Sequence, residues 1–233
     1  MIRIHTFGCS LTSYHNWQYL VTNHFYNGRN NDPDGINPWQ GDEIKHPTEW
    51  THNGIHLTDY SIAGAGNDTQ HIQYANSVYY GNILKDDIVL WQLSSPDRIS
   101  CHNDSNINSQ LITPNVFTGE EINIITKKEP DEPFPRTTTY STLWQLNGVK
   151  RNNDKLLVMF GWDSCWGTSE KNGVMKFLKE HDIDYIEESI LGWTTRHNFL
   201  KQDLEDIHPP QAGYKSFTED CLLPKLKKLK WLD

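Results

Sequence analysis

The chain has little cysteine and no excess of positive charge. Its 233 residues include four cysteines without a Cys-x-x-Cys spacing, which argues against a disulfide framework and predicts free thiols. Lys and Arg together number 21 and Asp and Glu 30, and the net charge of -9 disfavours a nucleic acid or an anionic membrane surface as a partner. We therefore expect no nucleic-acid and no membrane partner.

The sequence also lacks long apolar runs. None approaches the roughly 18 apolar residues that a membrane helix requires. The chain enters a predicted strand at Ile2 without a charged and then apolar leader, so we expect no signal peptide and a cytoplasmic protein. Export by another route, for example as part of a virus particle, stays open. The basic run at 225–230 is expected to be the solvated face of a terminal helix.

Apolar runs alternate with stretches of helical periodicity along the chain. Strands are expected at 2–7, 54–62, 87–93, 155–162 and 183–186. Helices are expected at 17–26, 67–78, 139–149, from a cap at Ser169 to 178, and through 217–226. The alternation predicts the α/β class: a three-layer α/β/α sandwich with a five-stranded parallel sheet of flavodoxin-like layout.

The length fits a single domain over residues 1–233. Two segments show no period and are rich in Asn, Pro and other turn-forming residues. We expect long loops there, at about 28–54 and 99–137.

The first predicted strand ends in a turn that carries Ser10, followed by a helix-like stretch. In an open α/β sheet, ligands bind at the carboxyl ends of the strands, and the N–H groups of a helix N-terminus favour developing negative charge. Ser10 is therefore the candidate nucleophile. Its ordinary alternative role is to cap the helix.

The second predicted strand ends at 63–68 (AGAGND). Gly64 and Gly66 match a dinucleotide fingerprint only weakly, because the third Gly is absent. We expect instead that Gly64 turns the backbone so that its N–H points into the cleft that Ser10 faces. Asn67 is expected to begin the next helix.

A histidine near the C-terminus has an unusual setting. His208 lies between an acidic cluster and a Pro pair, which predicts a loop that can reach another strand end. A neutral imidazole that a carboxylate orients can take the proton of a Ser hydroxyl and so activate it for acyl transfer. His208 is therefore the candidate general base.

Three short stretches, in order along the chain, resemble the SGNH hydrolase (GDSL) family. Residues 7–12 (FGCSLT) resemble its first block with Cys9 in the Asp position, 61–64 (SIAG) resemble the second, and 206–209 (DIHP) resemble the last. The resemblance implies the SGNH hydrolase fold, with Ser10 as nucleophile and His208 as base. It also implies that the backbone N–H groups of Ser10 and Gly64 are oxyanion donors.

The third block of the family departs from its pattern. Where the family has Gly-x-Asn-Asp, whose Asn amide donates to the oxyanion, this chain has SSPD at 94–97, with Pro96 at the Asn position. By its likeness to divergent, phage-type members, another residue would replace that amide. The candidates for this donor are Asn67, Ser94 and Ser95, and Arg98 would shape the pocket.

The acid that orients His208 has two candidates. The family's usual acid stands three residues before the His, which is Glu205 here, whereas Asp206 stands two before it. Some relatives use the shorter spacing and Asp is the commoner triad acid, so we favour Asp206 and keep Glu205 as the alternative. Cys9 is a possible thiol nucleophile by type, but the family pattern points it away from the oxyanion donors, so we expect a packing residue.

These residues predict a serine esterase that needs no metal and no cofactor and works through an acyl-Ser10 intermediate. Aromatic residues expected in loops would offer stacking surfaces for a sugar, so the predicted substrate is a small ester or an acylated, preferably acetylated, carbohydrate. Those residues are Trp39, Trp50, Trp162, Trp166 and Trp193. Two alternatives stay open: a carbohydrate-binding module with little or no activity, and an O-acyltransferase. The oligomeric state is not indicated.

Overall fold

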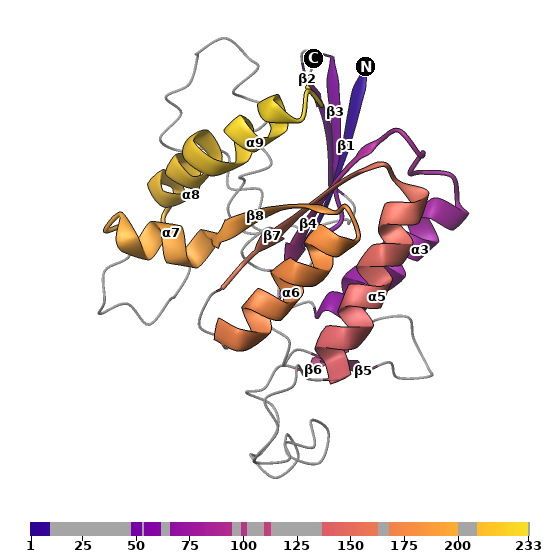
Figure 1. The fold of residues 1–233 in the computed structure, drawn as a ribbon. Helices are drawn as coiled ribbons and strands as arrows, with labels where there is room; N and C mark the ends of the chain where they lie inside the picture. Colours follow the sequence, from indigo (N-terminus) through magenta and orange to yellow (C-terminus); the bar gives the residue numbers. More distant parts are fainter. Residues whose placement is uncertain are drawn as a thin grey trace.

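A six-stranded sheet forms the centre of the molecule (Figure 1), seen in a computed structural model that describes residues 1–9, 48–52, 54–61, 66–94, 99–101, 110–112, 137–162, 168–199 and 209–232. The strand order is β2-β3-β1-β4-β7-β8. The strands are β1 (Ile2–Phe7), β2 (Thr48–His52), β3 (Ile55–Asp59), β4 (Ile88–Leu93), β7 (Lys155–Phe160) and β8 (Asp184–Ser189).

Five of these strands are parallel, as predicted. Strand β1 lies between β3 and β4, with Ile4 opposite both Leu57 and Ile88. Strand β7 continues the sheet from β4, and β8 forms its edge beside β7. The carboxyl ends of the parallel strands therefore lie together at one edge of the sheet, the edge that runs across the strand ends and not the edge that β2 or β8 forms.

The other edge strand corrects the prediction of one continuous loop at 28–54. Strand β2 is antiparallel to β3, with Trp50 opposite Leu57. Its short sequence, TEWTH, has too few apolar residues to stand out by period. The signal was the Asn-Gly pair at 53–54, a strong hairpin marker, and Gly54 indeed has a φ of 78°.

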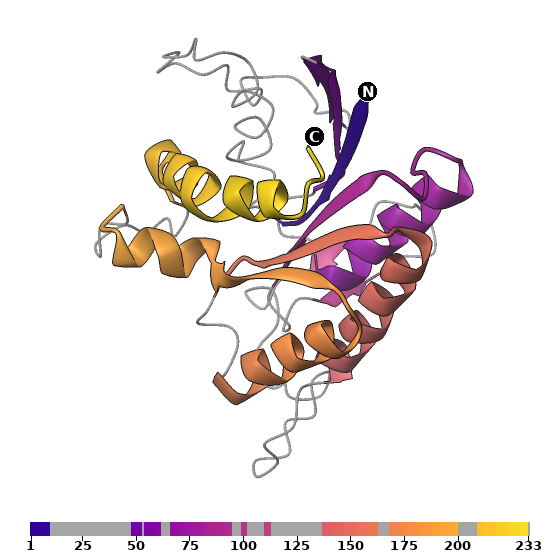
Figure 2. The same cartoon turned by 45° about the horizontal axis from the view of Figure 1, so that its top comes forward.

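Helices cover both faces of the sheet (Figure 2). One face carries α3 (Asn67–Tyr79), α5 (Thr137–Asn152) and α6 (Thr168–Glu180). The opposite face carries α7 (Ile190–Arg196) and a C-terminal helical run of α8 (Gln211–Phe217), the π-helical turn η1 (Thr218–Leu222) and α9 (Leu223–Lys228). The three-layer sandwich is thus confirmed.

The apolar runs explain the two layers of core. Successive residues of a strand point to opposite faces, so a strand covered on both sides must be apolar throughout. In β4, Leu90 belongs to the core under the C-terminal helices and Trp91 to the core under α3 and α5. Leu157 and Val158 of β7 divide in the same way.

One predicted helix boundary needs correction, and one helix was not predicted. Helix α6 begins at Thr168, so Ser169 lies within the helix and does not precede it as a cap. Helix α7 was not predicted, although its cap has a clear sequence basis: the Ser189 side chain accepts a hydrogen bond from the Gly192 N–H at 2.8 Å. Its seven residues are too few to show a period.

Short strands also interrupt the loop predicted at 99–137. Strands β5 (Ile99–Cys101) and β6 (Gln110–Ile112) pair with each other in an antiparallel sheet near the start of α5 (Figure 1). The predicted terminal helix with a basic face is present as α9, with Lys225, Lys227 and Lys228 in its last turn. Of the helices that the structure describes, none has the length and apolar character to cross a membrane.

Candidate active site

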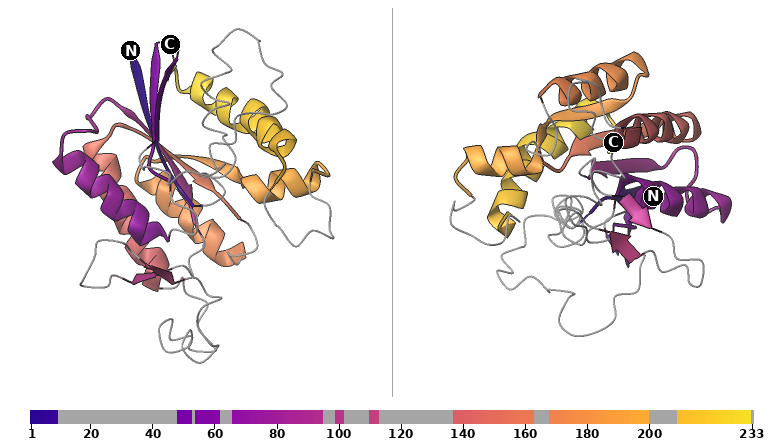
Figure 3. Two further views of the ribbon diagram at one scale, coloured as in Figure 1. Left: turned by 180° about the vertical axis from the view of Figure 1, so that it is seen from behind. Right: turned by 90° about the horizontal axis from the view of Figure 1, so that it is seen from below.

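Four neighbouring parallel strands lead into buried residues at one edge of the sheet, which faces the viewer in the right panel of Figure 3. Cys9 follows β1, Ser61 lies two residues after β3, Ser94 follows β4, and Trp162 lies two residues after β7. All four are buried. The segments that continue from Cys9, Ser61 and Ser94 are the ones in which sequence analysis placed Ser10, Gly64 and Ser95.

Two of the predicted site residues, Asn67 and Ser94, fall within the described structure. The others lie outside the described residues: Ser10, Gly64, Ser95, Arg98, Glu205, Asp206 and His208. The structure therefore shows the main chain that leads to those residues, and three sets of hydrogen bonds hold it at the ends of β1, β3 and β4.

The first link joins the end of β1 to β4. The Cys9 backbone N–H donates to Gln92 Oε1 at 3.1 Å, and the Cys9 thiol approaches the same oxygen at 3.2 Å. Gln92 is fully buried, and its amide nitrogen donates to the Leu93 carbonyl. The main chain directly before Ser10 is thereby held by a side chain of the neighbouring strand. Cys9 is buried in the core, as expected of a packing residue.

The second link joins β1 to β3. Asp59 is buried, and one of its oxygens, Oδ1, accepts from the Thr6 hydroxyl at 2.8 Å and from the Ser61 N–H at 2.9 Å. The Ser61 hydroxyl donates to the same oxygen at 2.5 Å. A buried carboxylate is tolerated when several donors satisfy it. Asp59 thus fixes the main chain that leads from β3 toward Gly64.

The third link joins the end of β4 to the start of α3. The Ser94 N–H donates to Asn67 Oδ1 at 2.8 Å, and Asn67 Nδ2 donates to the Ser94 carbonyl at 3.4 Å. The Asn67 amide therefore holds the backbone of residue 94 from both sides. Helix α3 begins at Asn67, as predicted.

Two buried polar groups beside this link have no hydrogen-bond partner among the residues that the structure describes. One is the Ser94 hydroxyl, and the other is the whole side-chain amide of Gln70, one helical turn after Asn67. Buried polar groups without partners are uncommon in folded proteins, and they are often explained by a functional role or by bound water. These groups are the described candidates for contact with a polar ligand at this edge.

Sequence reasoning missed Gln92, Asp59 and Gln70. The first two had a signal, since each is a polar residue within or at the end of an otherwise apolar strand. Gln70 had none, because a Gln within a helix is usually exposed.

The helix after the candidate base packs into the same core as the residue before the candidate nucleophile. Pro209 directly follows His208 and is buried. Tyr214 of α8 and Cys9 are members of one hydrophobic cluster, on the face of the sheet that carries α7 and α9. The described neighbours of Ser10 and His208 therefore lie on the same side of the sheet.

Five tryptophans were expected in loops as a sugar-stacking surface, but two of them lie in a strand or a helix and a third is buried. Trp50 lies in β2, Trp193 lies in α7, and Trp162 is buried. Trp193 stacks on His197 with ring centroids 4.0 Å apart. Trp39 and Trp166 lie outside the described residues. The prediction that all five lie in loops was wrong.

A buried His–Asp pair lies away from this edge. His5 of β1 is fully buried, and its Nε2 donates to Asp87 Oδ2 at 3.0 Å, just before β4 begins. Burial lowers the pKa of His5 below its usual value, although Asp87 acts in the opposite direction. His5 thus links the middle of β1 to the residue that precedes β4. Within the described ranges, no cluster of three His, Cys, Asp or Glu side chains could hold a metal ion.

No protein-family model and no curated protein matches the chain. Solved structures with a similar fold include an acetylxylan esterase and a lipase/acylhydrolase. A catalytic mutant of Axe2, an acetylxylan esterase from Geobacillus stearothermophilus, superposes with a TM-score of 0.57 at 11% identity and covers 100% of this chain and 96% of its own. The lipase/acylhydrolase from Enterococcus faecalis gives a TM-score of 0.54 at 14% identity, over 98% and 97% of the two chains.

Nothing in these similarities supports the predicted likeness to phage-type members. At sequence identities of 11% and 14%, the similarity establishes the fold alone. The chain has the SGNH hydrolase-like fold, in which a sheet with five parallel strands lies between two layers of helices, and the fold of these esterases is similar.

Proposed function

We propose that the protein is a serine ester hydrolase whose site lies at the carboxyl ends of β1, β3 and β4. The observation that carries the proposal is the full-length likeness in fold to esterases, together with the position of Cys9. Cys9 is held by Gln92 at the strand edge where α/β proteins bind ligands, and Ser10 is the next residue.

In the proposed reaction, the Ser10 hydroxyl oxygen attacks the ester carbonyl carbon while His208 takes the hydroxyl proton. The tetrahedral intermediate collapses, the ester C–O bond breaks, and His208 returns the proton to the departing alcohol. Water then attacks acyl-Ser10 with His208 again accepting a proton, and the carboxylic acid leaves as Ser10 regains its hydrogen. Asp206, or alternatively Glu205, would orient the imidazole.

The oxyanion would be stabilised by the backbone N–H groups of Ser10 and Gly64 and by one side-chain donor. Both Asn67 and Ser94 can donate, but the described contacts give them different parts. The Asn67 amide is already engaged with the Ser94 backbone, whereas the Ser94 hydroxyl has no partner in the described part of the chain. We therefore assign the donor to Ser94 and a positioning role to Asn67, with Ser95 as the remaining alternative and Arg98 in the pocket wall.

The substitution Ser94→Ala is expected to lower kcat on the order of 10²-fold with little change in KM, because an oxyanion donor acts mainly in the transition state. Stability should not fall, since the hydroxyl that is removed has no described partner. Asn67→Ala should lower both kcat and the thermal midpoint, because it removes two hydrogen bonds to Ser94. Steady-state kinetics and thermal melts measure both effects. If Ser94→Ala keeps the wild-type kcat, Ser94 is not the side-chain oxyanion donor, and Ser95 and Asn67 remain the candidates.

The substrate we propose is an acetylated carbohydrate. The similarity in fold to an acetylxylan esterase supports it. A small ester of another alcohol would react by the same steps.

The test of the function is acetate release by the wild-type protein from p-nitrophenyl acetate and from acetylated xylo-oligosaccharides. We expect release from both, with higher kcat/KM on the sugar. Analysis of products with an added unacetylated sugar acceptor separates the alternatives: new sugar ester would indicate an acyltransferase. Sugar binding without turnover of either ester would indicate a binding module and contradict the proposal.

A further inference from the structure

Helix α8 packs against α7 at a point where only a glycine fits. A Cβ atom on Gly213 would lie 2.9 Å from Thr194 Cγ2, 3.1 Å from Phe199 Cβ and 3.3 Å from Pro209 Cβ. Real Cβ atoms rarely come this close to three neighbours, since the packed interior of a protein leaves no room for such overlap. Gly213 therefore marks a close approach of two stretches of chain, the one through α7 to Phe199 and the one from Pro209 into α8.

Two of those neighbours flank the segment that holds the candidate base and both candidate acids. Phe199 precedes residues 200–208, and Pro209 follows them. Both Cβ atoms lie within 3.3 Å of the point where a side chain on Gly213 would begin. The two flanks of the segment thus converge on one backbone position.

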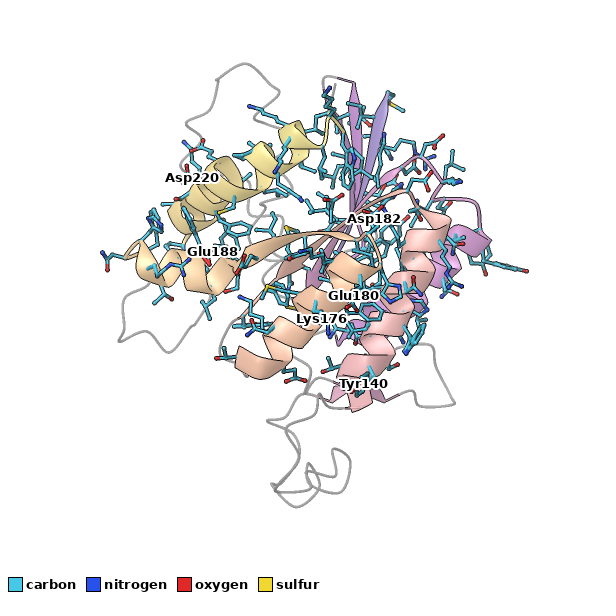
Figure 4. All side chains as sticks on the ribbon, in the orientation of Figure 1. Tyr140, Lys176, Glu180, Asp182, Glu188 and Asp220 are labelled. Atoms are coloured by element: carbon cyan, nitrogen blue, oxygen red, sulfur yellow. The ribbon has the colours of Figure 1, made fainter. Side chains whose placement is uncertain are left out.

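The Phe199 flank is tied to α7. The Phe199 N–H donates to the Thr194 carbonyl at 2.9 Å, and the Thr194 hydroxyl donates to the Ile190 carbonyl at 2.9 Å. An ion pair between Arg196 and Glu188 joins the end of α7 to β8, and Figure 4 labels Glu188 there. Phe199 is therefore fixed relative to the sheet through α7.

The Pro209 flank is tied to α8. The Pro210 carbonyl accepts from the N–H groups of Gly213 at 2.8 Å and Tyr214 at 3.2 Å, which closes the first turn of the helix. The helix is in turn linked to α7, because Trp193 Nε1 donates to the Ser216 hydroxyl at 3.1 Å. That hydroxyl donates to Asp220, labelled in Figure 4, at 3.0 Å.

We propose that Gly213 is a positioning residue for His208. By allowing α7 and α8 to touch, it sets the positions of Phe199 and Pro209, the described residues on either side of 200–208, and His208 is bonded directly to Pro209. Its effect on the reaction rests on the proposed function, but its effect on the placement of His208 does not. Gly213 touches no reacting atom and acts only through Phe199 and Pro209.

The test is Gly213→Ala. The new methyl group must push Phe199 and Pro209 by a few tenths of an ångström, because their Cβ atoms lie only 3.1 and 3.3 Å from the position it would take. We expect kcat for p-nitrophenyl acetate to fall about tenfold or more with KM within about twofold, since small displacements of a catalytic group strongly affect rate. We also expect the NMR signal of the His208 ring, assigned with a His208→Gln variant, to shift while those of His5 and His56 stay.

Matched controls are Gly148→Ala in α5 and Gly173→Ala in α6. Neither new Cβ would meet an atom within 4 Å, and Ala favours a helix over Gly. Both should keep wild-type kcat with an unchanged or higher thermal midpoint. If Gly213→Ala does not fold, the double variant with Thr194→Ser removes the closest methyl group and keeps the hydroxyl, so it replaces the single variant in both measurements.

A folded variant with an unshifted His208 signal would overturn the inference, whatever its kcat. A shifted signal with wild-type kcat would also overturn it, because the displacement would not matter to the reaction. If the wild-type protein hydrolyses no ester but the His208 signal still shifts, the proposed function fails and the placement role of Gly213 stands.

Discussion

Ser10→Ala is expected to lower kcat for p-nitrophenyl acetate by at least about 10⁴-fold, because loss of the nucleophile in a serine triad removes the acyl-enzyme route. The fold should remain intact. The main chain before Ser10 is held by the two contacts between Cys9 and Gln92, and both partners remain in the variant. Circular dichroism and a thermal melt check the fold, and stopped-flow release of p-nitrophenol checks the rate.

The matched control is Cys9→Ala, one residue away. Cys9 is the alternative nucleophile by chemistry, but it is fully buried in the core. Removal of a small buried thiol should cost some stability and leave the rate near that of the wild type. A folded Cys9→Ala protein without activity, beside an active Ser10→Ala protein, would contradict the assignment.

The second large effect is expected at the acid beside the base. Asp206→Asn should lower kcat by about 10⁴-fold, because an amide in place of the carboxylate favours the wrong imidazole tautomer and does not stabilise the imidazolium. Glu205→Gln, the matched change at the neighbouring position, should stay within about threefold of the wild type. Both are measured with the same ester under saturating conditions.

The reverse pattern would make Glu205 the acid. Equal and small effects in both variants would mean that His208 works without a carboxylate partner or is not the base. His208→Gln separates these outcomes, because loss of a general base should lower kcat as severely as loss of Ser10.

Strands β4 and β7 were the most readily predicted of the five parallel strands, because both are buried almost throughout. Strand β4, in which every residue is buried, is a continuous apolar run apart from Gln92. The edge strand β2 was not found, because it contributes a single large apolar side chain, Trp50, to its sequence. The helix α7 was not predicted because seven residues are too few to show a helical period, although Ser189 provides a regular N-cap.

The candidate site was predictable only in part. Asn67 and Ser94 were named from the sequence, and the structure joins them by two hydrogen bonds. The contact between Cys9 and Gln92 joins residues 83 positions apart, and no local pattern reveals such a partner. The close packing at Gly213 is similar, since it involves Thr194 in another helix.

The most direct test of the central claim is labelling with a fluorophosphonate, followed by identification of the modified peptide by mass spectrometry. The account predicts one label per chain, on Ser10, with loss of esterase activity in proportion to labelling. A label on any other residue would contradict it, and so would ester hydrolysis by fully labelled protein or by protein that the reagent fails to label.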